Sequence, residues 1–144
     1  MEKKIEKTRN NKRWTEARFR GFVTSALRGS FRRWPPKWDV LANACTGVKK
    51  NKSTGRQAKH YTCAICKKEF VAKGVQIDHI NPIGATDSWD AFIEALFCEA
   101  ENLQVACKSC HQQKSRKETK NRTKIKKNKF KSKNDTKKRL KNED

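Results

Sequence analysis

Long apolar runs are missing from this sequence. No segment approaches the roughly 20 apolar residues that a membrane-spanning helix needs. The segment Met1 to Lys4 also lacks the apolar stretch of a secretory signal. Hydrophobic residues make up 34% of the chain, enough for one small core but not for two. We therefore expect a cytoplasmic protein with one folded core and no membrane partner.

Acidic residues are scarce. The 15 Asp and Glu residues face 36 Lys and Arg residues, which gives a formal net charge of +21. A chain with this excess repels itself when compact and is attracted to polyanions. Charge alone leaves two interpretations open: a nucleic-acid partner, or a charge excess that only keeps the protein in solution.

The six cysteines fall into two classes. Four of them form two Cys-x-x-Cys pairs, Cys63/Cys66 and Cys107/Cys110. Four thiols at this spacing can close one tetrahedral structural Zn²⁺ site, and a reducing cytoplasm favours zinc over disulfides. Cys45 and Cys98 stand alone, and we expect them to be small buried hydrophobic residues.

The N-terminal part of the chain divides by composition. Residues 1–13 are expected to be a flexible basic arm. Residues 14–59 are expected to form a basic helical region that ends in a linker. Within this region, apolar residues recur at helical spacing over residues 14–32, and residues 37–44 suit a short helix. Residues 46–59 are rich in Gly, Ser, Asn and Lys, which is typical of a loop.

The first of these helices is amphipathic. Its apolar stripe consists of Phe19, Phe22, Val23, Ala26 and Leu27. We expect this stripe to pack on the domain, so that the arginines of the opposite face point outward, toward solvent or phosphates. Phosphate contacts are expected from basic residues in the N-terminal helical region and the last helix: Arg18, Arg28, Arg32, Arg33, Lys37, Lys114 and Arg116.

Residues 60–120 contain the expected core. The predicted elements are strands at 67–72 and 75–80, a helix at 89–97, a strand at 103–106 and a helix at 108–120. The first two strands would form a hairpin around Lys73-Gly74, and Asp87-Ser88 would cap the first helix.

Residues 121–144 form a Lys-rich tail of low complexity. Its isolated Ile125, Phe130 and Leu140 provide no periodic apolar face, so we expect disorder. Two roles stay open for this tail. It could raise affinity for any duplex by releasing counterions, or it could only aid solubility.

Between the cysteine pairs lie a carboxylate, an imidazole and an amide. The written order is C-A-I-C, then V-Q-I-D-H-I-N-P, then E-N-L-Q-V-A-C-K-S-C-H. From Tyr61 to about Lys117, this order resembles the HNH endonuclease family, in its zinc-stapled branch. The segment from Phe31 to Trp38 also resembles the leader of small HNH proteins of tailed bacteriophages. The resemblance implies an α+β fold with a ββα-metal (HNH/His-Me finger) core at residues 60–120, preceded by basic helices and followed by the disordered tail.

The resemblance also implies a role for each polar residue. His79 matches the general base of the family, and Asn102 matches the Asn that closes the loop and helps to hold that imidazole. Asp78 and His111 match the ligands of a catalytic Mg²⁺ or Mn²⁺. The implied activity is metal-dependent hydrolysis of phosphodiester bonds in DNA, and double-stranded DNA is the favoured substrate. A phage terminase is a further candidate partner, and the location would be the host-cell cytoplasm if the protein is phage-encoded.

The sequence leaves other roles open for two histidines and for the protein as a whole. His111 could join the zinc shell in place of a cysteine, and His60 is expected to be an exposed loop residue outside the motif. The protein could be a non-catalytic, zinc-dependent DNA-binding module or phage packaging accessory. An RNA-binding or RNA-cleaving protein is favoured least, because the sequence lacks the aromatic stacking motifs of common RNA-binding modules.

Overall fold

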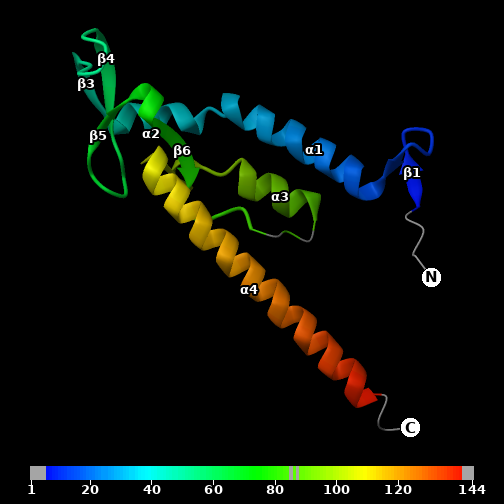
Figure 1. Cartoon of the computed structure of the whole chain (residues 1–144). Coiled ribbons are helices and arrows are strands. Elements are labelled where there is room, and N and C mark those ends of the chain that lie inside the picture. The colour runs from blue at the N-terminus through cyan, green and yellow to red at the C-terminus, as the bar shows by residue number, and fades with distance from the viewer. Residues whose placement is uncertain (1–5, 85, 87, 141–144) are drawn as a thin grey trace.

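The protein has a mixed α+β fold, shown by a computed structural model that describes residues 6–84, 86 and 88–140 (Figure 1). The strands are β1 (Lys7–Arg9), β2 (Trp14–Thr15), β3 (Cys45–Lys50), β4 (Gln57–Thr62), β5 (Glu69–Val71), β6 (Val75–His79) and β7 (Leu103–Cys107). The α-helices are α1 (Glu16–Ser30), α2 (Pro36–Ala44), α3 (Trp89–Leu96) and α4 (Lys108–Leu140). Short 3₁₀ turns are η1 (Phe31–Arg33), η2 (Ala72–Gly74) and η3 (Ala100–Asn102).

The antiparallel pair β6–β7 lies at the centre of the fold. Its register is unbroken, from Val75 opposite Cys107 to His79 opposite Leu103. Helix α4 begins directly after β7 and packs on both strands. The core is small and lies along β7, with buried side chains at Cys63, Phe92, Leu96, Leu103, Val105, Ala106 and Cys107.

The N-terminal helices are attached to this unit through aromatic contacts. The Trp34 indole N–H donates a hydrogen bond of 2.7 Å to the Cys98 carbonyl. The Trp34 ring also meets Phe97 edge-on, with 5.3 Å between centroids. Helix α2 contacts both β6 and β7. The basic helical region is therefore packed on the core.

Helix α1 confirms the helix predicted over residues 14–32, with a capped start. The Thr15 hydroxyl accepts a hydrogen bond from the Arg18 backbone N–H at 3.2 Å. The expected burial of its apolar stripe was only partly right, because Phe22 is 59% exposed and α1 has no fully buried residue. Helix α1 instead meets α3 through cations over rings, with Arg20 above Trp89 and Arg28 above Phe92.

Two segments expected to be irregular are paired strands instead. Part of the predicted flexible arm forms β1, which pairs with β2 through a turn in which Asn10, Asn11 and Lys12 have positive φ. Asn tolerates this left-handed region better than most residues. Residues 1–5 of the arm lie outside the described residues. The predicted linker 46–59 forms most of the β3–β4 hairpin.

The strands predicted at 67–72 and 75–80 exist in part but do not pair with each other. Strand β5 pairs with β4, and β6 pairs with β7. The intervening residues form the turn η2, which carries the chain from one sheet to the other. The predicted helix at 89–97 is confirmed as α3, and Ser88 caps it. Asp87 lies outside the described residues.

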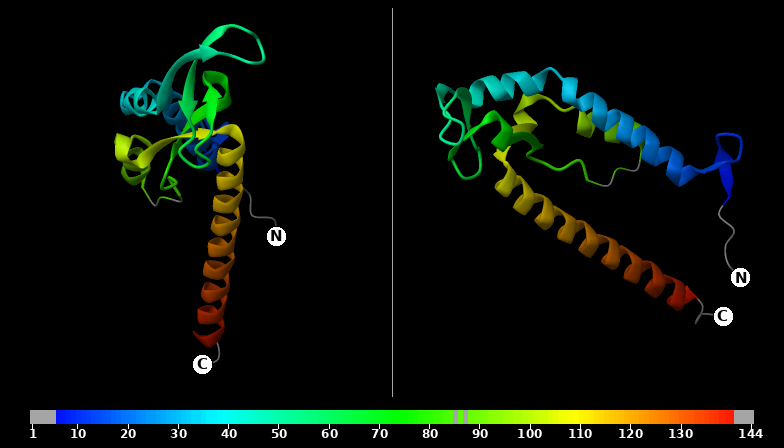
Figure 2. Two further views of the ribbon diagram at one scale, coloured as in Figure 1. Left: turned by 90° about the vertical axis from the view of Figure 1, so that its left-hand side faces the viewer. Right: turned by 45° about the horizontal axis from the view of Figure 1, so that its top comes forward.

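Helix α4 corrects the expectation of a disordered tail. It continues to Leu140 and extends away from the rest of the molecule (Figures 1 and 2), while residues 141–144 lie outside the described residues. No Gly or Pro follows Gly84 in the sequence, and Lys and Arg have good intrinsic helix propensity. Ile125, the tail residue among Ile125, Phe130 and Leu140 whose side chain the structure describes, is 56% exposed, so the helix forms there without burying it.

None of the helices in the described part of the chain is long and apolar enough to cross a membrane. This finding agrees with the absence of long apolar runs in the sequence.

Leu96 is expected to be a main source of stability. Its side chain is 1% exposed, so Leu96→Ala should lower the free energy of unfolding by about 2–5 kcal/mol through lost burial and a residual cavity. Ile93 on the same helix is 39% exposed, and Ile93→Ala should change stability by about 0.5 kcal/mol or less. Urea unfolding followed by circular dichroism compares the two variants. Equal losses would show that α3 is not packed as described.

Candidate functional site

Four cysteine thiols come together beside the β6–β7 sheet. Cys63 directly follows β4 and Cys66 lies in the tight turn after it, while Cys107 ends β7 and Cys110 lies in the first turn of α4. All four Sγ atoms lie within 4.8 Å of one another, and those of Cys66 and Cys107 are 4.0 Å apart. Thiolates around a tetrahedral Zn²⁺ are about 3.8 Å apart. The cluster therefore fits a structural metal ion, as the sequence predicts.

The surroundings of the four thiols favour the thiolate form at Cys63 and the protonated form at Cys110. Burial raises the pKa of the Cys63 thiol, but hydrogen bonds from nearby backbone N–H groups outweigh burial and lower this pKa to about 6. One of these N–H groups belongs to Cys107 and lies 3.3 Å from the Cys63 Sγ. Hydrogen bonding to the Cys107 thiol, together with burial, raises the pKa of Cys110 to about 12. A cation that bound all four thiolates would displace the remaining protons.

The other cysteines and His60 lie outside this cluster. Cys45 and Cys98 are half-buried, and burial raises the pKa of Cys98. His60 is not in an exposed loop as expected. It lies half-buried on β4, with its Nδ1 2.9 Å from the Ala58 carbonyl oxygen. His111 is not among the clustered metal-ligating groups found in the described residues, which are the four cysteines alone.

A cleft of about 380 Å³ opens at the other end of β6, where the strand ends. It is lined mainly by β6, the loop after it and the first turns of α4, with Arg28 and Phe31 contributing from the N-terminal region. Asp78 and His79 both line it, although neighbouring residues on a strand point to opposite faces. His79 is the last residue of the strand, so the cleft lies at the strand end, which side chains from both faces border.

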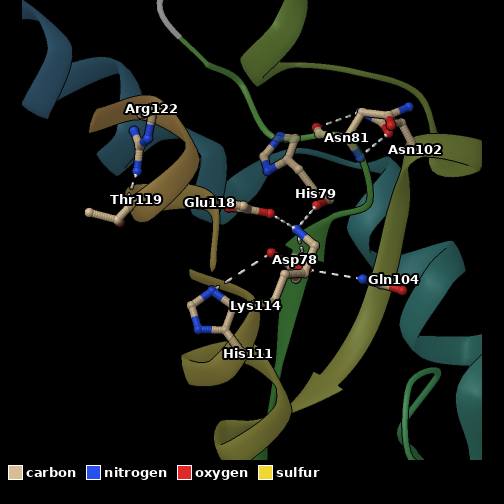
Figure 3. A network of polar contacts seen from close by, with 10 residues as sticks. All are labelled: Asp78, His79, Asn81, Asn102, Gln104, His111, Lys114, Glu118, Thr119 and Arg122. Carbon is tan, nitrogen blue, oxygen red and sulfur yellow. Dashed lines mark hydrogen bonds and ion pairs between the residues drawn. The ribbon is translucent and has the colours of Figure 1, made fainter. Parts of the chain in front are cut away.

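Asp78 is the most enclosed charged residue of the cleft, 9% exposed. Its Oδ2 accepts hydrogen bonds from the Gln104 amide at 3.0 Å and lies 3.1 Å from the Lys114 ammonium (Figure 3). Its Oδ1 lies 3.7 Å from His111 Nε2. Metal–oxygen and metal–nitrogen bonds of about 2.1 Å can span such a separation. Asp78 and His111 are therefore placed so that one divalent cation could bind both.

His79 is held by a backbone carbonyl. Its Nε2 lies 2.9 Å from the Leu96 carbonyl oxygen, which can only accept a hydrogen bond, so Nε2 carries the proton. In the neutral ring, Nδ1 then has a free lone pair. The ring also packs against Phe31, with 4.9 Å between centroids and a 30° tilt. The structure thus holds one tautomer and one orientation of this imidazole.

Asn102 fixes the loop that follows His79. Its Oδ1 accepts a hydrogen bond from the Asn81 backbone N–H at 2.9 Å, and its Nδ2 donates to the Asn81 carbonyl at 3.4 Å. The Asn102 carbonyl also accepts from the Ile80 N–H at 2.8 Å. These three bonds bind the start of the loop to the turn before β7, where the sequence places the bracing amide.

Lys114 differs from its expected role. Instead of pointing outward to phosphates, its ammonium donates to the His79 carbonyl at 2.6 Å and contacts Asp78 and Glu118 (Figure 3). Burial acts to lower the pKa of Lys114, but hydrogen bonds to Glu118 and Asp78 outweigh it and raise that pKa. Sequence reasoning missed Glu118. The signal was the spacing of His111, Lys114 and Glu118 at i, i+3 and i+7, which places them on one helix face.

The remaining basic residues predicted to contact phosphates are distributed unevenly. Only Arg28 of this group lines the cleft, where Arg122, which was assigned to the tail, joins it. Arg18 lies over the Trp14 ring, and Arg33 and Arg116 are exposed. Arg32 donates to the Gly29 carbonyl, and Lys37 donates to the Arg32 carbonyl and lies over Phe31. Burial, with Arg32 nearby, lowers the pKa of Lys37.

Comparison with protein-family models, with curated proteins and with solved structures found no match for this chain.

A test of the four-thiol centre uses two cysteine variants. Cys66→Ser should abolish stoichiometric zinc binding and cooperative unfolding, because a lost thiolate opens a site that joins segments about forty residues apart. Cys98→Ser, outside the cluster, should keep both. Metal content by atomic absorption and thermal unfolding give the two measurements. A Cys66→Ser protein that retains zinc and its unfolding transition would contradict the assignment.

Proposed function

We propose that this protein is a metal-dependent DNA endonuclease of the HNH type, which hydrolyses phosphodiester bonds in its cleft. The observation that carries the proposal is the His79 imidazole. Its Nε2 proton is committed to the Leu96 carbonyl, and its Nδ1 lone pair is left available in a cleft that also contains Asp78 and His111. An imidazole with a free lone pair can act as a general base toward a water molecule.

The chemistry assigned to each residue follows from these contacts. His79 removes a proton from the water that attacks the phosphorus. Asn102 keeps the loop after His79 in place, and the Lys114 ammonium, bound to the His79 carbonyl, supports the strand end. Arg28 and Arg122 at the cleft are placed to attract the phosphate backbone. Asp78 and His111 would hold Mg²⁺ or Mn²⁺, which when bound supplies Lewis-acid stabilisation of charge on the phosphate.

The four thiols have a separate task in this proposal. A Zn²⁺ ion held by Cys63, Cys66, Cys107 and Cys110 would be structural, since four protein ligands leave no open position for a substrate. The excess of Lys and Arg supports a polyanionic substrate, and the extended α4 places many cations on one projecting helix.

One observation favours the second candidate, a zinc-dependent DNA-binding module without catalysis. Asp78 already has partners within the protein, Gln104 and Lys114, and such saturation is also what a purely structural ion network shows. The two candidates differ in whether divalent cations bind at Asp78 and whether DNA is cut.

The first experiment tests cutting. Wild-type protein should convert supercoiled plasmid to relaxed or linear plasmid in the presence of Mg²⁺ or Mn²⁺. His79→Ala should cut about 10²–10⁴-fold more slowly with its affinity for duplex DNA unchanged, because the base acts only in the chemical step. His60→Ala is the matched control, since His60 lies on β4 and does not line the cleft. Cutting by His79→Ala at the wild-type rate would exclude the proposed base.

The second experiment tests the cation site through its internal competitor. Lys114→Met removes the ammonium from Asp78, so Mn²⁺ should bind at least about tenfold more tightly, which corresponds to about 1.4 kcal/mol of relieved competition. Lys117→Met on an exposed face of the same helix is the control. Calorimetric titration of the zinc-loaded protein with Mn²⁺ gives the affinities. Weaker binding by Lys114→Met would mean that Lys114 orients Asp78 for the cation and does not compete with it.

A further inference from the structure

The segment that contains the β3–β4 hairpin and the first cysteine pair has an unusual charge pattern. Residues 40–68 contain no Asp or Glu. The same residues contain seven cations: Lys49, Lys50, Lys52, Arg56, Lys59, Lys67 and Lys68. In a linker these charges would be scattered over many conformations. The structure instead places most of them on the β3–β4 hairpin.

The hairpin presents these cations from a defined backbone. At its tip, the Asn51 N–H donates to the Arg56 carbonyl at 2.7 Å and the Gly55 N–H donates to the Asn51 carbonyl at 2.8 Å. Gly55 has a φ of 71°, a conformation that glycine adopts without steric cost. The tip is therefore a hydrogen-bonded turn, and the backbone positions of its charged residues are defined.

The strand register separates the two faces of the hairpin. Lys49 pairs with Glu69 at 2.7 Å, and hydrogen bonding to Lys49 is the main cause of the lowered pKa of Glu69. Neighbouring Lys50 points to the other face. It lies opposite Gln57, and Val48 lies opposite Lys59 on that same face. On one face of the hairpin, the charge of Lys49 is therefore balanced by Glu69, while the other face carries Lys50 and Lys59.

The cations of the tip and of this second face have no acidic partner among the described residues. Lys50, Lys52, Arg56 and Lys59 are all exposed, and none forms an ion pair with a residue in the described part of the chain. Val48, 61% exposed, is the one large apolar side chain that stands out on the hairpin. A single valine gives no apolar patch of the size that lipid or protein interfaces use.

We propose that the β3–β4 hairpin is a second nucleic-acid contact, which binds the phosphate backbone of duplex DNA outside the cleft. The proposal rests on the proposed function, because it takes DNA as the ligand. Four exposed cations on a projecting ribbon complement a duplex, which carries one negative charge per about 1.7 Å of its axis. Gln57, on the same face as Lys50, adds an amide that can donate to phosphate or to a base edge.

The position of the hairpin connects this DNA contact to the cleft. It projects from the body at the end opposite the free end of α4 (Figures 1 and 2). Strand β4 also pairs with β5, and the short turn η2 then leads into β6, the strand that ends in Asp78 and His79. A duplex held by the hairpin would therefore be fixed relative to the strand that carries the cleft residues, which lengthens the footprint on DNA.

The experiment compares two full-length variants with the same loss of charge. The hairpin variant replaces Lys50, Lys52, Arg56 and Lys59 with Gln. The control variant replaces four exposed lysines from other parts of the chain with Gln: Lys7, Lys12, Lys73 and Lys108. Affinity for a 30-base-pair duplex is measured by fluorescence anisotropy over a series of salt concentrations. No Mg²⁺, Mn²⁺ or chelator is added, so that cutting is avoided and zinc is kept.

The hairpin variant should bind more weakly than the control variant and show a smaller salt dependence. Each lost phosphate contact lowers the slope of log affinity against log salt by about 0.9, so a fall of about 2–4 units is expected, against less than about 1 for the control. A Lys52→Gln/Arg56→Gln variant alters only the exposed turn and should show about half of the fall. This smaller variant covers the case in which the fourfold change unfolds the hairpin.

Equal salt slopes for the hairpin and control variants would overturn the proposal, because net charge alone would then explain binding. A hairpin variant that keeps wild-type affinity would also overturn it, because the four cations would then contribute nothing to DNA binding. These results do not depend on catalysis. A wild-type protein that binds DNA through the hairpin but cuts no plasmid would support the contact and refute the proposed nuclease.

Discussion

The convergence of four cysteine thiols is the constraint on which the arrangement of the cleft depends. Cys107 ends β7 and Cys110 lies one turn into α4, so their position beside Cys63 and Cys66 determines how α4 leaves the sheet. His111 and Lys114 follow on that helix and reach Asp78 at the far end of β6. The core has few fully buried side chains, so a metal bound by the thiols would contribute much of the folding free energy.

Charge is used in two ways in this molecule. Inside the cleft, Lys114 lies among Asp78, Glu118 and the His79 carbonyl, and low exposure makes these interactions stronger than surface ion pairs. On the outside, arginines lie over the rings of Trp14 and Trp89. In a chain with only 34% hydrophobic residues, such contacts allow basic residues to serve as packing material and still face the solvent.

The sequence was most informative where residue chemistry and spacing act together. The thiol pairs predicted one metal cluster, and Ser88 predicted the start of α3. It was least informative about pairing. Residues 46–59 contain Gly, Ser and Lys and look like a loop, but their backbone groups find partners in β3 and β4. Likewise, β6 pairs with β7, which is distant in the sequence, and not with the preceding strand β5. The hydrophobic pattern predicts a strand but does not predict which other strand it pairs with.

By itself, then, the sequence determined which groups are available: four thiols at metal-binding spacing, Asp78 beside His79, an amide at Asn102 and a large cationic excess. These follow from covalent order and from the chemistry of side chains. The tertiary structure decided which atom of each group is free. It turned Lys114 inward and gave His79 the Leu96 carbonyl as a partner. It paired Lys49 of the hairpin with Glu69, whereas the other four hairpin cations form no ion pair within the described residues. Such outcomes depend on contacts between segments far apart in the chain, where burial and hydrogen-bond geometry select one arrangement among many that the local sequence allows.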